Sequence, residues 1–106
     1  YFLGGKSGDK YELFGAYPHM HKLGRKFNLE ITQKDSGKST CGIDLQRWDF
    51  NWQRMYYYKK PVLIDDNTRL NVSCTFDTRS ATQAIEPGFG TGNEMCLLGM
   101  YLVKAN

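Results

Sequence analysis

Histidine, tryptophan, cysteine and proline are all scarce in this chain of 106 residues, which contains two histidines, two tryptophans, three cysteines and three prolines. Three cysteines exclude a disulfide-dense scaffold, and the odd number indicates one disulfide with one cysteine left over. An oxidised pair would place the chain in an extracellular, lumenal or periplasmic compartment. No apolar run approaches the roughly 18 residues of a membrane-spanning helix, so no membrane span is expected.

The chain also lacks a strong excess of either positive or negative charge. The net charge is only +3 and both signs are spread along the chain, which argues against a nucleic-acid partner. Hydrophobic residues make up 41% of the chain and aromatic residues 14%, enough for a packed core. The length fits one domain over residues 1–106. The chain starts with Tyr1 and shows no leader, so we expect a fragment or subunit of a larger protein.

Strand patterns dominate the remaining sequence. Apolar and polar residues alternate over 27–32 and 70–77, as in strands with one buried face. The runs 62–64 and 96–103 are more continuously apolar, which fits strands that are covered on both sides or that line a sandwich core. Aromatic residues alternate over 48–52, which favours a strand there over a helix. Turn-rich segments separate these runs at 34–37, 65–67 and 87–93. The fold class predicted is all-β, an antiparallel sandwich or jelly roll.

The two histidines are His19 and His21, one residue apart. On a strand, residues i and i+2 point to the same face, so the two imidazoles can converge on one metal ion. Two ligands do not complete a site, and a third must come from elsewhere. A thioether as the third ligand would select copper, especially cuprous copper, whereas a carboxylate would indicate zinc or non-haem iron. By spacing alone, ordinary surface or core histidines remain an alternative.

Three segments together resemble one known family. The run 14–25 contains His19-Met20-His21-Lys22-Leu23-Gly24 and resembles the His-x-His-x-x-Gly motif of the copper type II, ascorbate-dependent monooxygenases. The run 93–96, Asn-Glu-Met-Cys, resembles the Glu-Met-Cys signature of the same family. The run 48–53 is similar to a segment of bacterial relatives.

The resemblance implies a ligand set, a disulfide and a cofactor. The copper ligands would be His19, His21 and Met95, and Cys74 would be bonded to Cys96. Without the resemblance, Met95 would be assigned to packing and Cys74 to a buried thiol. Cys41 would be either a free thiol or paired outside this chain.

The resemblance also implies an activity. Family members hydroxylate a C–H bond with dioxygen and two electrons from ascorbate, using two copper sites on two domains. This chain resembles only the second, oxygen-binding domain, and it has no histidines left for the three-histidine site of the first. We therefore expect a missing partner domain or subunit, and no hydroxylation by the isolated domain. The alternative is a non-catalytic copper-binding or structural subunit of a larger assembly.

The substrate side differs from the peptide-amidating members. They bind a carboxylate with an arginine, an asparagine and a tyrosine at positions that are Tyr17, Leu97 and Gly99 here. The charge-assisted hydrogen bonds to a carboxylate would be lost, which favours a more apolar or aromatic small-molecule substrate. Family domains also carry more chain before the His-x-His motif, so one or more N-terminal strands of the sandwich are expected to be missing, leaving open edges.

Overall fold

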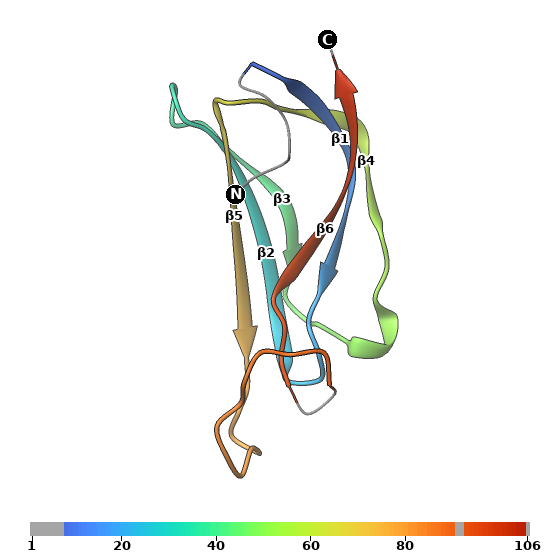
Figure 1. The fold of residues 1–106 in the computed structure, drawn as a ribbon, viewed down its shortest axis with the longest axis vertical. Helices are drawn as coiled ribbons and strands as arrows, with labels where there is room; N and C mark the ends of the chain where they lie inside the picture. Colours follow the sequence, from blue (N-terminus) through green and yellow to red (C-terminus); the bar gives the residue numbers. More distant parts are fainter. Residues whose placement is uncertain (1–7, 91–92, 106) are drawn as a thin grey trace.

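The computed structural model describes residues 8–90 and 93–105, apart from the side chain of Trp52. It has the strands β1 (Lys10–His19), β2 (Gly24–Gln33), β3 (Ser39–Leu45), β4 (Tyr56–Ile64), β5 (Thr68–Phe76) and β6 (Leu97–Ala105), and one 3₁₀ turn, η1 (Phe50–Trp52). The strands form two antiparallel three-stranded sheets, ordered β4-β1-β6 and β3-β2-β5 (Figure 1). The predicted all-β fold class is confirmed, and the arrangement is that of a β-sandwich.

The core lies between the two sheets. Strand β2 alternates as its sequence predicts, with Phe27, Leu29 and Ile31 buried and Lys26 and Glu30 exposed. The opposite sheet contributes further side chains to the same cluster, which comprises Leu13, Ala16, Met20, Phe27, Leu29, Ile31, Ile43 and Ile64. Burial of this apolar surface is the main stabilising contribution to a sandwich of this size.

The apolar runs of β4 and β6 are covered on one face only within the described residues. In β6, Leu98 and Met100 pack against the core, whereas Leu97 and Tyr101 are 48% and 49% exposed. In β4, Leu63 is likewise 48% exposed. Of the two arrangements that the sequence allowed, these strands therefore line a sandwich core and are not covered on both sides.

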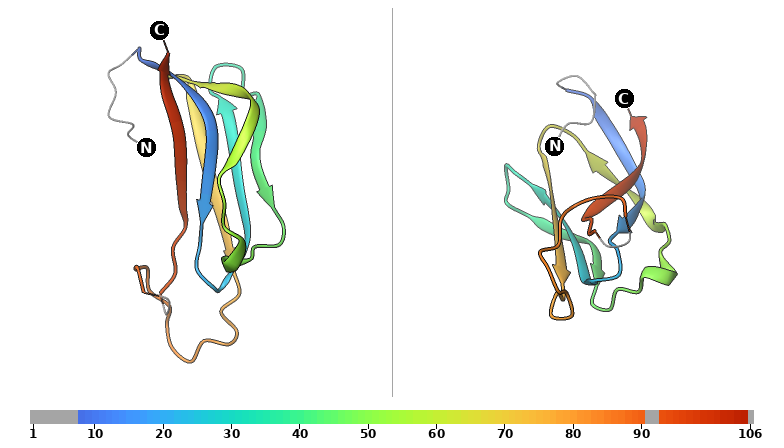
Figure 2. Two further views of the ribbon diagram at one scale, coloured as in Figure 1. Left: turned by 90° about the vertical axis from the view of Figure 1, so that its right-hand side faces the viewer. Right: turned by 60° about the horizontal axis from the view of Figure 1, so that its bottom comes forward.

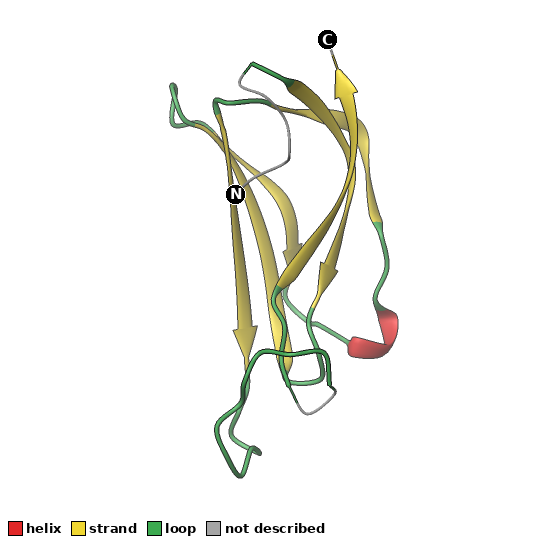
Figure 3. Ribbon diagram, viewed as in Figure 1, coloured by secondary structure: helices red, strands yellow, loops and turns green. Residues whose placement is uncertain are grey.

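The predicted strand at 48–52 is wrong. Residues 50–52 form η1 instead, and β4 begins only at Tyr56 (Figure 3). Asp49 caps the turn because its carboxylate accepts a hydrogen bond from the Asn51 backbone N–H at 2.9 Å. Such a side-chain acceptor satisfies a free donor of the first turn and makes a turn more favourable than continued extension.

Three connections gather at one end of the sandwich. They are the turn from β1 to β2, the segment containing η1, and residues 77–90 and 93–96 of the long connection from β5 to β6 (Figures 1 and 2). A disulfide between Cys74 and Cys96 joins β5 to the chain just before β6, with 5.9 Å between the Cα atoms. Cys41 is an exposed free thiol in the described part of the chain. No helix among the described residues has the length and apolar character needed to cross a membrane.

Candidate metal centre

His19 and His21 lie together at the end of β1. His19 is the last residue of that strand and His21 lies two residues beyond it. Their ring centroids are 5.1 Å apart and the rings are nearly perpendicular, at 82°. Met20, between them, is fully buried in the core. The alternation expected for a strand thus continues one step past its end and brings both imidazoles to the same side.

The turn after His21 is tight. The Gly24 backbone N–H donates to the His21 carbonyl oxygen at 3.2 Å. A Cβ atom at position 24 would lie 2.9 Å from three atoms of the Met20 side chain. The glycine of the His-x-His-x-x-Gly motif therefore has a packing reason here, since only a residue without a side chain lets Met20 fill the core beneath the turn.

Each imidazole has its Nδ1 atom hydrogen-bonded to a carbonyl oxygen. Nδ1 of His19 lies 2.5 Å from Oε1 of Gln53, and Nδ1 of His21 lies 2.9 Å from the backbone oxygen of Asn93. A carbonyl oxygen can only accept, so the proton of each neutral ring belongs on Nδ1. Both Nε2 atoms are then left with the lone pair that a metal ligand needs.

The Nε2 atoms are also accessible. Among the described residues, the Tyr58 hydroxyl is the only buried side-chain polar atom without a hydrogen-bond partner. Neither Nε2 has a hydrogen bond in the described part of the chain, so neither can be fully buried. His21 as a residue is only 5% exposed, which leaves its ring little freedom to turn away.

Met95 lies in the segment that faces this histidine pair. Two residues before it, the Asn93 carbonyl accepts from His21. Two residues after it, Leu97 is paired with His19 in the β1–β6 ladder. The residue directly after Met95 is Cys96, which is held by its disulfide to Cys74. The backbone around Met95 is thus fixed on both sides with respect to the histidines.

The described residues contain no group of three or more His, Cys, Asp and Glu side chains that could hold a metal ion. The ligand set predicted from the sequence, two imidazoles and the thioether of Met95, has a different composition and stays a prediction.

The model of one protein family, described as the copper type II ascorbate-dependent monooxygenase C-terminal domain, matches residues 7–104. The chain belongs to this family. The matched range includes the histidine pair, the Glu-Met-Cys segment and both cysteines of the disulfide, and the resemblance inferred from the sequence is confirmed.

Two curated relatives are similar over most of this monooxygenase domain. Dopamine beta-hydroxylase of Rattus norvegicus is 28% identical over 92 residues, which cover 87% of this chain and 14% of the relative. Tyramine beta-hydroxylase of Caenorhabditis briggsae is 25% identical over 95 residues, which cover 89% of this chain and 16% of the relative. The chain therefore spans only about a sixth of the length of these relatives.

Glu94 joins the histidine segment to the Met95 segment through hydrogen bonds. Its carboxylate accepts hydrogen bonds from the backbone N–H groups of His21 and Leu23, both at 2.8 Å, and of Met95 at 3.2 Å. The residue is 7% exposed, and its own backbone is held by hydrogen bonds to the 86–88 segment. A buried carboxylate needs this number of donors to offset its desolvation. Sequence reasoning read Glu94 only as part of the Glu-Met-Cys signature and gave it no role.

Gln53 and Trp48 hold the histidine segment from the other side. Gln53 contacts His19 as described, and the Trp48 indole N–H donates to the His21 carbonyl oxygen at 3.1 Å. Both residues lie in the run 48–53 that the sequence analysis singled out, but the alternating pattern there predicted a strand. The signal in the sequence was the Gln53 amide and the Trp48 indole N–H, because both groups need hydrogen-bond partners when they are buried.

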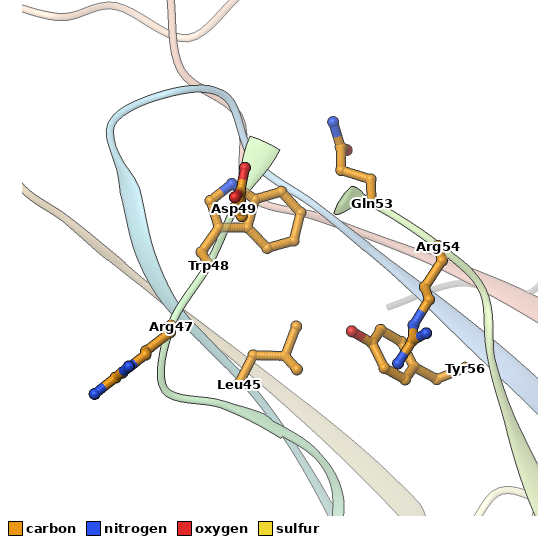
Figure 4. A pocket seen from close by; sticks show the side chains of 7 residues that line it. All are labelled: Leu45, Arg47, Trp48, Asp49, Gln53, Arg54 and Tyr56. Atoms are coloured by element: carbon orange, nitrogen blue, oxygen red, sulfur yellow. The ribbon is translucent and has the colours of Figure 1, made fainter. Parts of the chain in front are cut away.

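A small cavity lies behind this support. Its lining residues are Leu45, Arg47, Trp48, Asp49, Gln53, Arg54 and Tyr56. Figure 4 shows the Arg54 side chain over the Tyr56 ring, and the guanidinium carbon lies 5.0 Å from the ring centroid. Trp48 and Gln53 line this cavity and also contact the His21 carbonyl oxygen and His19, so the cavity lies beside the histidine pair.

The start of the long connection is anchored beside the same turn. The Asp77 backbone N–H donates to the Leu23 carbonyl oxygen at 2.9 Å. The Asp77 carboxylate pairs with the Arg79 guanidinium, which lowers the pKa of that carboxyl far below its usual range through their hydrogen bonds. The pair is solvent-exposed, so its contribution to stability is small.

Proposed function

We propose that the chain binds one copper ion through Nε2 of His19, Nε2 of His21 and the thioether sulfur of Met95. The observation that carries the proposal is the shared tautomer, in which both Nδ1 atoms are hydrogen-bonded to carbonyl oxygens so that both Nε2 atoms are free on neighbouring rings. Two imidazoles with a thioether form a soft donor set that suits copper, above all cuprous copper. The residues present therefore fit the metal that the family name specifies.

In this proposal the domain is the oxygen- and substrate-binding half of an ascorbate-dependent monooxygenase. The bound copper would supply the redox chemistry for activating dioxygen. The chain's own residues would hold the ligands in place: Glu94 ties the His21 turn to the Met95 segment, and the Cys74–Cys96 disulfide restrains that segment where it meets β6. Such outer contacts keep ligands oriented and raise metal affinity.

Both histidines of the chain are used by this one site. A second, three-histidine copper site would need a partner domain or subunit, and the isolated domain would not hydroxylate a substrate by itself. The disulfide favours an oxidising compartment, either extracellular or periplasmic.

We also propose a small aromatic substrate for the complete protein. His19 pairs with Leu97 and Tyr17 with Gly99 across β1 and β6, so these residues share the sheet face on which His19 stands. None of them offers a positive charge to a carboxylate. The two relatives are named for dopamine and tyramine, which are aromatic amines and not peptide acids.

An anaerobic titration with cuprous ion tests the copper proposal. Wild type should bind one equivalent, and His19→Ala and His21→Ala should each lose stoichiometric binding, while Lys22→Ala, an exposed residue of the same turn, should not. Absence of binding by folded, oxidised wild type would contradict the proposal. Copper binding without oxygen consumption by the complete, ascorbate-supplied protein would favour the alternative, a non-catalytic copper-binding or structural subunit.

A further inference from the structure

The Gln53 side chain bridges η1 and His19 with both ends of its amide. Its Nε2 donates to the Phe50 carbonyl oxygen at 2.9 Å, and its Oε1 lies 2.5 Å from Nδ1 of His19. Because the Phe50 oxygen can only accept, the amide nitrogen must face it. The amide oxygen is therefore directed at His19 by a contact that does not involve the histidine.

An acceptor in this place decides which nitrogen of His19 carries the proton. A neutral imidazole has one N–H, and a hydrogen bond from Nδ1 to Oε1 keeps that proton on Nδ1. His21 reaches the same tautomer in another way, through the backbone oxygen of Asn93. A side-chain substitution can remove the first acceptor and leave the second in place.

We infer that Gln53 is a positioning residue for the metal centre, which holds His19 in its Nδ1–H tautomer and keeps the unprotonated Nε2 directed outward. The effect on the apo protein is independent of any metal, whereas its consequence for copper rests on the proposed function.

The surroundings support a positioning role. Gln53 directly follows η1, whose first residue is preceded by the Asp49 cap. Among the described residues, no hydrogen bond joins the neighbouring Arg54 to either histidine, and its guanidinium lies over the Tyr56 ring instead (Figure 4). Gln53 and Arg54 are therefore adjacent in sequence and line the same cavity, but only Gln53 reaches His19. This makes Arg54 a matched control.

Long-range ¹H–¹⁵N NMR of the metal-free domain tests the inference at about pH 9, above the range in which histidine titrates. The chain has only two histidines, so both ring patterns can be assigned. In wild type, both rings should carry the proton on Nδ1. In Gln53→Leu, His19 should shift towards the Nε2–H form while His21, held by Asn93, stays unchanged. Arg54→Leu should leave both rings as in wild type.

A conservative variant distinguishes the effect of the acceptor facing His19 from the effect of the hydrogen bond to η1. Gln53→Glu keeps an oxygen facing His19 and loses the bond to Phe50, so His19 should remain in the Nδ1–H form. An Nε2–H pattern for His19 in wild type would overturn the inference, whatever the variants do. So would an unchanged His19 in folded Gln53→Leu, or loss of the Nδ1–H form in Gln53→Glu.

The second readout is the cuprous affinity of the same proteins. Loss of an outer-shell partner of a metal-bound histidine costs about 10- to 100-fold in affinity, so Gln53→Leu should bind that much more weakly than Arg54→Leu. Equal affinities would overturn the positioning role toward copper. Wild type that shows the predicted tautomers but binds no copper would contradict the proposed function and leave the inference about the apo protein intact.

Discussion

The carboxylate of Glu94 lies 2.8 Å from the backbone nitrogen of His21 and accepts its hydrogen bond. The two residues are 73 positions apart in sequence, and the bond joins the turn after β1 to the segment before β6. The same carboxylate binds the N–H groups of Leu23 and Met95. One side chain thus fixes the spacing between the histidine segment and the methionine segment.

Replacing Glu94 by alanine should weaken both the fold and the site. The N–H groups of His21 and Leu23 would lose a charged acceptor, and hydrogen bonds of this kind contribute about 1.5–3 kcal/mol each when buried. We expect the free energy of unfolding to fall by about 3 kcal/mol and cuprous affinity to fall about 10- to 100-fold. Denaturant titration and metal titration measure the two effects. Glu86→Ala, an exposed glutamate of the same connection, is the control and should change neither.

The disulfide should contribute measurably to stability. It joins Cys74 and Cys96, which are 22 positions apart in sequence, and the entropy of closing such a loop corresponds to about 3 kcal/mol. The double variant Cys74→Ser/Cys96→Ser should lose roughly that amount in denaturant unfolding. Cys41→Ser changes an exposed free thiol and should stay within about 0.5 kcal/mol of wild type. A double variant as stable as wild type would contradict a stabilising disulfide between Cys74 and Cys96.

The Tyr58 hydroxyl should reduce the stability of the fold. It is buried and has no hydrogen-bond partner among the described residues. A hydroxyl in this state costs about 1–3 kcal/mol, so Tyr58→Phe should raise the free energy of unfolding by about 1 kcal/mol. Tyr57→Phe is the matched control, because the Tyr57 side chain is 71% exposed and its hydroxyl is solvated. A destabilised Tyr58→Phe variant would show that the hydroxyl has a partner.

Tyr58 should also ionise at a higher pH in the folded chain than in the unfolded chain. Burial raises the pKa of its phenol above the ordinary value of 10.0, and the neighbouring Cys41 adds to the increase. The unfolded chain therefore releases this proton first, and stability that is fully present below about pH 10 falls as the pH rises toward the folded pKa. Tyrosinate absorbance during alkaline titration checks this, since Tyr58→Phe should remove a transition that lies above pH 10.0. An unchanged titration curve would argue against the shift.

The fold was predictable because its signals are local. The alternation over 27–32 lies in β2 with the expected face buried, and that over 70–77 lies mostly in β5, where Leu70, Cys74 and Phe76 are partly buried but Val72 is 37% exposed. The aromatic alternation over 48–52 misled because one capping carboxylate, Asp49, makes a 3₁₀ turn more favourable than a strand. A period of two over five residues is too short to outweigh such a contact.

The outer shell of the site was not predictable, because its contacts join distant residues. His19 meets Gln53 across 34 positions, and His21 meets Asn93 across 72. The sequence has no periodic pattern from which the partner of such a polar residue could be predicted. In addition, the acceptor for His21 is the backbone oxygen of Asn93, which does not depend on the residue type. The motif residues His19, His21 and Met95 could be proposed from the sequence because the family resemblance gives their order, while the contacts that orient them depend on the fold.

The central claim is that Met95 is the third copper ligand, and X-ray absorption at the copper edge tests it most directly. Cuprous wild type should show one equivalent of copper with a copper–sulfur shell, and Met95→Leu should lose that shell and bind more weakly. Met100→Leu, a methionine that packs against the core, should retain both. A wild-type spectrum without sulfur, or a sulfur shell that persists in Met95→Leu, would contradict the two-histidine, one-methionine site.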